Sequence, residues 1–284
     1  MQVIEELGAL RQTLADWRRQ GQRIALVPTM GNLHAGHLDL VRHAQTLADQ
    51  VVVSIFVNPT QFGPNEDLAA YPRTLAQDQQ RLREHQVGLL FLPDVNTLYP
   101  GGLPTQLRVE VTGLSDILCG EFRPGHFVGV ATVVAKLFIA VMPDVAVFGE
   151  KDCQQLMVIR RMTRELLLPI QIEGVPTRRE ADGLALSSRN QYLNPTERAQ
   201  ASALYQVLHA LRERILAGAR DYQALEAQAR QRLQALNFMP DYVSVRRAED
   251  LQPPSPADKD LVVLAAAYLG RARLIDNLNI IIGS

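Results

Sequence analysis

The sequence predicts an α/β protein that has a doubly wound parallel sheet followed by a smaller C-terminal α+β domain. Through residues 1–175, continuous apolar runs alternate with helical patterns, which is typical of a parallel sheet covered on both faces. From residue 176 onward the order changes to helices and then to long strand-like runs. The length of 284 residues also suits two domains of ordinary size. We therefore expect one domain at residues 1–175 and a second at residues 176–284.

The first domain is expected to start with an amphipathic helix over residues 1–21, which Gly21 ends. One apolar stripe on this helix consists of Ile4, Leu7, Leu10, Leu14 and Trp17. Buried strands are expected at residues 23–27, 51–57, 88–93, 144–149 and 169–175. The helical patterns between them cover residues 36–48, 74–85, 128–141 and 151–166.

The second domain is expected to begin its helices at Asn194, which suits an N-cap and precedes Pro195 and Glu197. Two helices are expected at residues 196–217 and 222–236. Strand-like runs follow at residues 241–247, 261–269 and 272–281.

The composition favours a folded protein of the reducing cytosol. Hydrophobic residues make up 47% and charged residues 21%, so a sizeable core is expected, and the net charge of −1 argues against a nucleic-acid binder. Cys119 and Cys153 lie far apart without CxxC spacing, which disfavours a disulfide framework and a zinc site. The N-terminus does not resemble a signal peptide, and the apolar residues 127–141 contain Lys136 and are too few to span a bilayer. We expect a cytoplasmic protein without nucleic-acid or membrane partners.

The stretch PTMGNLHAGH, residues 28–37, lies where a predicted strand ends and a helix begins. In open parallel sheets, ligands bind beyond the carboxyl ends of the strands, and a helix N-terminus there suits phosphate. Gly31 and Gly36 let a base and a phosphate chain approach the backbone closely. His34 and His37 are placed to donate hydrogen bonds to charge that develops on phosphate oxygens.

The histidine pair also fits other interpretations less well. Zinc hydrolases carry HExxH, whereas His34 and His37 are three apart and lack the glutamate, so metal ligation is disfavoured. A dinucleotide fingerprint is also disfavoured because GxGxxG spacing is absent. A purely structural pair remains as an alternative.

Polar residues also follow the next predicted strand. Asn58 and Gln61, in residues 56–74, are amides that can orient a small polar substrate, although an ordinary polar loop explains them equally well.

Residues 148–156 (FGEKDCQQL) follow the fourth predicted strand, and Gly149 opens a tight turn there. Lys151 lies at a helix start, where its charge opposes the dipole, so an anionic ligand is favoured over a solvated helix end. Asp152 suits ribose hydroxyls or an ion, and Gln155 shares the helix face of Lys151.

Residues 182–193 (DGLALSSRNQYL) place two hydroxyls and a guanidinium in a row. Ser187, Ser188 and Arg189 suit polyphosphate, and a simple polar linker is the alternative.

Together these stretches resemble the pantoate–β-alanine ligase family, a relative of class I aminoacyl-tRNA synthetases and other nucleotidyltransferases. The similarity covers nearly the whole chain, through residues 28–37, 56–63, 71–74, 119–138, 148–155, 182–190 and 272–277. It implies a Rossmann-like ATP-binding domain, a smaller C-terminal lid domain and a homodimer. It also implies two steps: pantoate and ATP give pantoyl adenylate and pyrophosphate, and β-alanine then gives pantothenate and AMP.

By this resemblance, ATP is bound by three segments and by Arg178, which replaces an often apolar residue near the adenine. The first segment comprises Met30, Gly31, Asn32, Leu33, His34, Ala35, Gly36 and His37. The other two comprise Gly149, Glu150, Lys151 and Asp152, and Leu186, Ser187, Ser188 and Arg189. His34, His37 and Lys151 are the implied catalytic residues.

The resemblance also implies the substrate ligands. Gln61 and Gln155 carry over as pantoate ligands, with Asn58 and Arg123 as further candidates, and Gln61 also lies near β-alanine. Asp78 matches an acidic position linked to Mg²⁺, although its neighbour Gln77 is acidic in some relatives.

The two steps make different chemical demands. The pantoate carboxylate is already ionised at neutral pH, so the first step needs in-line positioning and charge neutralisation and no general base. His37 is commonly assigned in the family as a proton donor, and we expect it to act mainly by hydrogen bonding to phosphate. The second step needs a neutral amine and exclusion of water, for which residues 61–67 and the C-terminal domain are candidates.

Two rival functions remain open on the sequence. One is another adenylate-forming nucleotidyltransferase that acts on a different acid. The other is a non-catalytic nucleotide-binding or RNA-binding module, which the near-neutral charge disfavours.

Overall fold

The computed structural model describes residues 1–64, 66 and 68–283. The chain folds into two compact units. The first comprises Met1–Glu150 and Gln155–Pro176, and the second comprises Lys151–Gln154 and Thr177–Ser284. Asp67, at the end of the loop expected to close over the substrates, lies outside the described residues.

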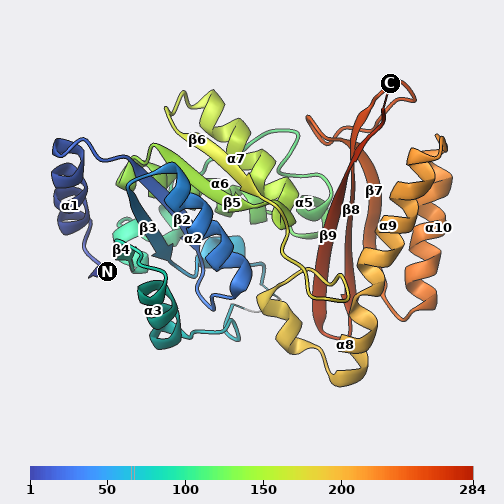
Figure 1. The fold of residues 1–284 in the computed structure, drawn as a ribbon, viewed down its shortest axis with the longest axis horizontal. Coiled ribbons are helices and arrows are strands. Elements are labelled where there is room, and N and C mark those ends of the chain that lie inside the picture. Colours follow the sequence, from blue (N-terminus) through green and yellow to red (C-terminus); the bar gives the residue numbers. More distant parts are fainter. Residues whose placement is uncertain (65, 67, 284) are drawn as a thin grey trace. The chain divides into compact units, whose positions relative to one another are not determined.

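The first unit is built on a six-stranded sheet with the order β1-β4-β3-β2-β5-β6, in which every pairing is parallel (Figure 1). The strands are β1 (Gln2–Ile4), β2 (Ile24–Thr29), β3 (Gln50–Ile55), β4 (Leu89–Phe91), β5 (Val145–Gly149) and β6 (Gln171–Val175). The expected doubly wound parallel sheet is therefore confirmed, and β2 to β6 correspond to the five strands expected from the apolar runs.

The expectation for the N-terminus was partly wrong. Gln2–Ile4 forms strand β1, paired with β4, and the helix begins only at Leu7. Ile4 fits the apolar stripe of a helix, but an edge strand three residues long is too short to show a period of its own.

Helices cover both faces of this sheet. They are α1 (Leu7–Arg19), α2 (Ala35–Leu47), α3 (Leu75–Glu84), α4 (Val95–Leu98), α5 (Cys119–Phe122), α6 (His126–Val141) and α7 (Cys153–Glu165). Val147 packs with the core beneath α2, whereas its neighbour Phe148 meets Phe138 of α6 at a ring distance of 6.3 Å. Because successive strand residues point to opposite faces, α2 and α6 lie on opposite sides of the sheet.

The strand order reverses between β2 and β5. β2 pairs with β3 on one side and with β5 on the other, so the chain runs outward in both directions from this point. In open α/β sheets, ligands bind outside the carboxyl ends of the strands at such a switch point.

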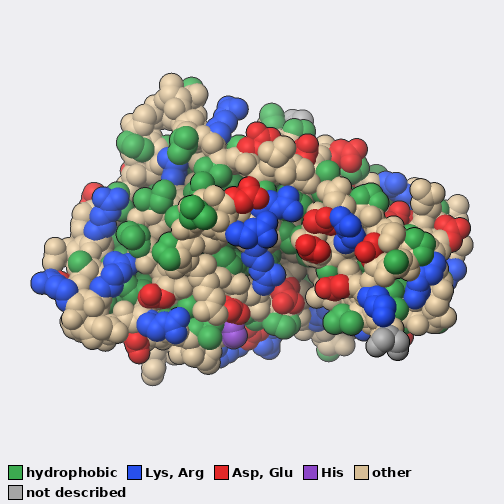
Figure 2. Space-filling view, turned by 90° about the horizontal axis from the view of Figure 1, so that it is seen from above, with side chains coloured by type: hydrophobic (Ala, Val, Ile, Leu, Met, Phe, Trp, Pro, Cys, Tyr) green, Lys and Arg blue, Asp and Glu red, His purple; other side chains and the backbone are tan. Residues whose placement is uncertain are grey.

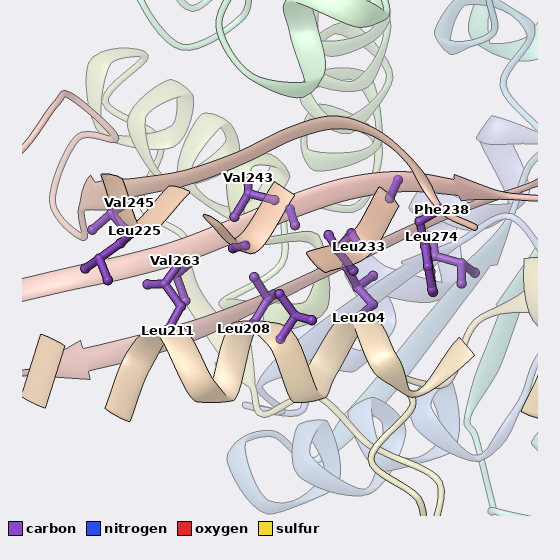
Figure 3. Close-up of a cluster of buried hydrophobic side chains, with 14 of the residues drawn as sticks. Leu204, Leu208, Leu211, Leu225, Leu233, Phe238, Val243, Val245, Val263 and Leu274 are labelled. Carbon is purple, nitrogen blue, oxygen red and sulfur yellow. The ribbon is translucent and has the colours of Figure 1, made fainter. Parts of the chain in front are cut away.

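The second unit packs helices α9 (Ala203–Leu216) and α10 (Tyr222–Ala235) against a three-stranded antiparallel sheet, and the short helix α8 (Pro195–Ala201) precedes them. The strands are β7 (Met239–Arg247), β8 (Asp260–Leu269) and β9 (Ala272–Ile281). Figure 3 shows Leu204, Leu208 and Leu211 of α9 pointing toward the sheet. These leucines are at most 3% exposed, so this unit has a core of its own.

One expected helix of this unit is divided. Residues 196–217 form α8 and α9, with a break at Ser202. The backbone N–H of Gln206 still donates to the Ser202 carbonyl, so the interruption is local. Within the described residues, no helix has the length and apolar character needed to cross a membrane.

Candidate active site

Three of the polar stretches follow neighbouring strands of the parallel sheet. Asn58 follows β3, Met30 follows β2, and Glu150 follows β5. β2 lies between β3 and β5, and parallel strands end at one edge of the sheet. The loops that were singled out in the sequence therefore leave the sheet at its switch point.

The loop after β2 has an unusual backbone that is held by a buried carboxylate. Gly31 and Asn32 both have positive φ, at 81° and 50°. The backbone N–H groups of Asn32 and Leu33 donate to the two oxygens of Asp78, at 2.9 and 2.8 Å. A Cβ at Gly31 would lie 3.1 Å from Ile55 Cγ2 and 3.2 Å from Asp78 Oδ2, so the turn requires glycine.

The Asp78 carboxylate, which the resemblance implied as a Mg²⁺ ligand, accepts three hydrogen bonds from the protein. The side chain is 1% exposed, and the Thr74 hydroxyl donates to Oδ2 at 3.1 Å in addition to the two backbone bonds. Arg81, one turn further along α3, donates to the Leu33 carbonyl. Among the described residues, no group of three or more His, Cys, Asp or Glu side chains is arranged to hold a metal. Asp78 and Arg81 therefore bind the loop from α3.

His34 and His37 cap the N-terminus of α2 with their own rings. His34 Nδ1 accepts from the Gly36 backbone N–H, and His37 Nδ1 accepts from the His34 backbone N–H, each at 3.2 Å. The helix thereby satisfies N–H groups that lack intrahelical partners. The ring centroids lie 4.1 Å apart with an interplanar angle of 35°.

These caps determine which ring nitrogen carries the proton. A nitrogen that accepts a hydrogen bond has no proton, so a neutral imidazole with an accepting Nδ1 carries its proton on Nε2. In this tautomer both Nε2–H groups are donors, and both residues lie at a helix N-terminus, where the dipole favours an anion.

Asn58, expected as a pantoate ligand, braces the loop after β3. It is 1% exposed and donates to the Gly129 carbonyl at 3.1 Å and to Gln61 Oε1 at 3.3 Å. Its Oδ1 accepts from Tyr99 at 2.8 Å, and burial raises the pKa of Tyr99, which keeps the phenol protonated as a donor. Thr60 also donates to Oδ1. Asn58 thus sets the position of its neighbour Gln61.

Gln61 connects the loops after β2 and β3. Its side-chain amide donates to Met30 Sδ at 2.7 Å, while its backbone carbonyl accepts from His126 Nδ1 at 2.8 Å. Helix α6 approaches closely here, because a Cβ on Gly129 would lie 2.4 Å from the Thr60 carbonyl oxygen. The two predicted binding segments are therefore in direct contact in the first unit.

Arg123, also expected at pantoate, is paired with Glu66. Its Nε and NH2 groups donate to Glu66 Oε1 and Oε2 at 2.7 and 2.6 Å, and NH1 contacts His126 Nε2 at 2.9 Å. Burial alone would raise the pKa of Glu66, but the hydrogen bond and charge of Arg123 outweigh it and hold that pKa below its usual value. The guanidinium charge is thus neutralised within the protein.

Lys151 and the serine–arginine segment belong to the second unit. Lys151, Ser187 and Asn190 line one small cavity, of about 10 Å³, which brings the two predicted phosphate-binding segments together. Ser187 caps a 3₁₀ helix (Ser188–Tyr192) by accepting from the Arg189 backbone N–H at 3.3 Å.

The remaining predicted residues lie at the ends of these segments. Gln155 is half-buried in α7 of the first unit, and Asp152 lies 4.0 Å from the Lys151 ammonium. The side chain of Arg178 is exposed, and its backbone carbonyl accepts from the Leu186 N–H at 2.9 Å.

Sequence reasoning missed several supporting residues. Tyr99, His126 and Glu66 hold the segment around Gln61, yet none was singled out as a supporting residue. Glu66 lies in the stretch at residues 61–67 that was expected to exclude water, and His126 lies in the stretch at residues 119–138 that carries the family resemblance.

Comparison with known proteins shows the family of the chain. The model of the family Pantoate-beta-alanine ligase matches residues 2–279. The pantothenate synthetase of Pseudomonas aeruginosa strain PAO1 is 58% identical over 280 residues, which cover 99% of both chains. That of Methylococcus capsulatus is 58% identical over 278 residues, covering 98% of this chain and 97% of the relative.

Solved structures show the same similarity. Pantothenate synthetase from Thermus thermophilus superposes with a TM-score of 0.91 at 45% identity, covering 98% of this chain and 99% of that one. A pantoate-beta-alanine ligase from Francisella tularensis, complexed with Beta-gamma ATP and β-alanine, gives 0.82 at 35% identity, covering 98% and 97%.

We expect Asp78→Asn to destabilise the fold and slow catalysis together. The amide has one acceptor oxygen, so one of two buried backbone N–H groups loses its partner, at about 2–3 kcal/mol of unfolding free energy. Urea unfolding measures this loss, with Asp16→Asn as the control, because the Asp16 side chain is 45% exposed on α1. An unchanged unfolding free energy with a raised Mg²⁺ requirement would instead make Asp78 a metal ligand.

The Glu66–Arg123 pair gives stability a defined pH dependence. Because the pKa of Glu66 is lowered in the fold, the pair stabilises above the unfolded value near 4.5, and this stability is lost as pH falls through the folded value. Glu66→Gln is expected to lower the unfolding free energy by about 1–2 kcal/mol at neutral pH. The difference in unfolding free energy between Glu66→Gln and the wild type should disappear at acidic pH.

Glu165→Gln is the control for this experiment, since Glu165 forms an exposed ion pair with Arg164. A Glu66→Gln effect that stays constant from neutral to acidic pH would contradict the assignment.

Proposed function

The chain belongs to the pantoate–β-alanine ligase family, whose members are carbon–nitrogen ligases, and we propose that it condenses (R)-pantoate with β-alanine in a reaction driven by ATP. The products are pantothenate, AMP and pyrophosphate, and pantoyl adenylate is the intermediate. The observation that carries the proposal is the pair of Nε2–H donors, His34 and His37, at the N-terminus of α2 beside the sheet's switch point.

This arrangement suits adenylate formation. The pantoate carboxylate attacks the α-phosphorus of ATP, and negative charge moves onto the phosphate oxygens as pyrophosphate leaves. Fixed donors aimed at that charge stabilise the transition state without reorganising. A neutral imidazole that donates through Nε2 is suited to this role. We therefore assign hydrogen bonding, and not proton transfer, to His37.

The ATP contacts that we propose come from three segments. Residues 30–37 and 149–152 follow β2 and β5, and residues 186–189 include the Ser187 cap. Lys151 and Arg189 supply positive charge for the phosphates, and Ser187 and Ser188 supply hydroxyls. Arg178 has an exposed side chain, so we propose that it meets the adenine at the rim.

Pantoate and β-alanine are assigned to the loop after β3. We propose that Gln61 and Gln155 hydrogen-bond pantoate and that Gln61 also contacts β-alanine. Asn58 and Arg123 act through Gln61, because their polar groups are bonded to the protein around it. Exclusion of water from the acyl adenylate is the role that we propose for the C-terminal domain.

Mg²⁺ does not fit a protein-built site on Asp78, whose oxygens accept hydrogen bonds from Asn32, Leu33 and Thr74. Protein-bound Mg²⁺ is commonly held by substrate phosphates together with few carboxylates. We propose that the ion enters with ATP.

The proposed partners are small molecules and a second copy of the chain. On the face shown in Figure 2, basic side chains lie among acidic ones and do not form an uninterrupted stripe, which supports a small-molecule enzyme over an RNA-binding module. Exposed Ile139 and Met142, at 58% and 65%, provide apolar surface suited to a homodimer contact.

Release of AMP from ATP tests the proposed function. The assay omits pantoate and β-alanine in turn, and AMP should accumulate only when both are present. AMP release that does not depend on pantoate would contradict the function and favour another acid substrate.

Variants of His37 test how it acts. His37→Ala should slow single-turnover adenylate formation by about a hundredfold, as the loss of one transition-state donor does. His37→Gln places an amide N–H near Nε2 and should recover at least a tenth of the wild-type rate. His34→Ala should slow the same step. A His37→Gln variant as slow as His37→Ala would mean that His37 transfers a proton.

A further inference from the structure

Two buried polar residues of β9 have no role in the site described so far. Asp276 and Asn277 end the stretch at residues 272–277 that contributes to the family resemblance, and they are only 4% and 8% exposed. Buried polar side chains are retained with hydrogen-bond partners, so the partners show what such residues do.

Asp276 fixes its strand to the hairpin that leads into the serine–arginine segment. Its oxygens accept from the two terminal nitrogens of Arg179 at 2.6 and 2.9 Å. The same guanidinium donates to the Gly183 carbonyl at 3.0 Å and lies 4.3 Å from the centre of the Tyr205 ring. Such a bidentate, stacked arginine is held in one orientation.

Asn277 extends this framework to Lys151. Its backbone N–H donates to Asp276 Oδ1 at 2.8 Å, and its side-chain Nδ2 donates to the Lys151 carbonyl at 2.9 Å. Asn277 also pairs with Leu264 in the β8–β9 ladder, so its backbone is fixed by the sheet. Arg179, Asp276, Asn277 and Lys151 therefore form one connected chain of contacts.

The hydrogen bond from Asn277 affects where the positive charge of Lys151 is placed. Lys151 lies in a short 3₁₀ turn (Glu150–Asp152) between β5 and α7. The hydrogen bond from Asn277 ties the Lys151 carbonyl to strand β9, which the ladder with β8 holds in place. Asp276 and Lys151 line the same cavity as Ser187, so the framework lies beside the proposed phosphate-binding groups.

We propose that Asn277, held by Asp276, is a positioning residue that sets the Lys151 backbone for phosphate-charge neutralisation. The proposal rests on the function proposed above, in which Lys151 contacts ATP. In this role Asn277 acts through the Lys151 carbonyl.

Asn277→Asp tests this inference with the smallest change in shape. The variant replaces an N–H donor with an oxygen that faces the Lys151 carbonyl, so the turn must move. A displacement of about 1 Å at a positioned group costs up to a hundredfold in rate, and we expect at least a tenfold slower single-turnover formation of pantoyl adenylate. The matched control is Asn279→Asp, an exposed residue on the same face of β9, which should keep the wild-type rate.

Two further measurements distinguish a positioning role of Asn277 from a general loss of folded protein: the burst amplitude, and the effect of Asn277→Asp in a Lys151→Ala background. With ATP and pantoate in excess over enzyme, the burst amplitude of pantoyl adenylate should stay at the wild-type level, because the folded fraction is unchanged while the rate constant falls. In a Lys151→Ala background, Asn277→Asp should cause no further slowing, because it acts through Lys151.

Three results would overturn the proposal: a wild-type rate in Asn277→Asp, a reduced amplitude with an unchanged rate constant, or a full additional loss in the Lys151→Ala background. A wild-type chain that forms no adenylate from pantoate and ATP would contradict the proposed function itself, which distinguishes the two failures.

Discussion

The hydrogen bonds from Asn32 and Leu33 to the buried Asp78 carboxylate are the constraint on which the site depends. They hold two consecutive residues with positive φ, and the chain then enters α2 at one defined angle. That entry places His34 at the N-cap, where the two imidazoles accept backbone N–H groups through Nδ1. The orientation of each Nε2–H follows from these contacts and needs no ligand to induce it, which is the preorganisation that electrostatic catalysis requires.

Buried polar groups hold one another in the rest of the site as well. The Asn58 side chain forms hydrogen bonds with Tyr99, Thr60, Gly129 and Gln61. Gln61 in turn donates to Met30 Sδ. Arg123 pairs its charge with Glu66 and thereby holds the segment whose carbonyl His126 also binds. Asn58 and Arg123 thus hold their neighbours in place, whereas Gln61 is the residue of this loop that we propose to contact substrate.

The parallel sheet could be predicted from the sequence because buried strands are continuous apolar runs, such as residues 51–53. The alternation of these runs with helical patterns is visible in the sequence alone. β1 could not, since three residues at a sheet edge carry no period. The histidines could be assigned to a strand-to-helix turn, and their spacing excluded a zinc motif. The roles of Asp78 and Arg123 could not be predicted, because their partners lie 46 and 57 residues away in the chain and only the fold brings them together.

The tautomer of the two histidines is the most direct test of this account. Long-range ¹H–¹⁵N spectra of histidine-labelled protein, recorded without ligands at mildly alkaline pH, distinguish a nitrogen that carries a proton from one that accepts a hydrogen bond. The account predicts that both His34 and His37 show a protonated Nε2 and an accepting Nδ1. A protonated Nδ1 on either ring would contradict it, because that ring could not cap α2 and would not present its Nε2–H to phosphate.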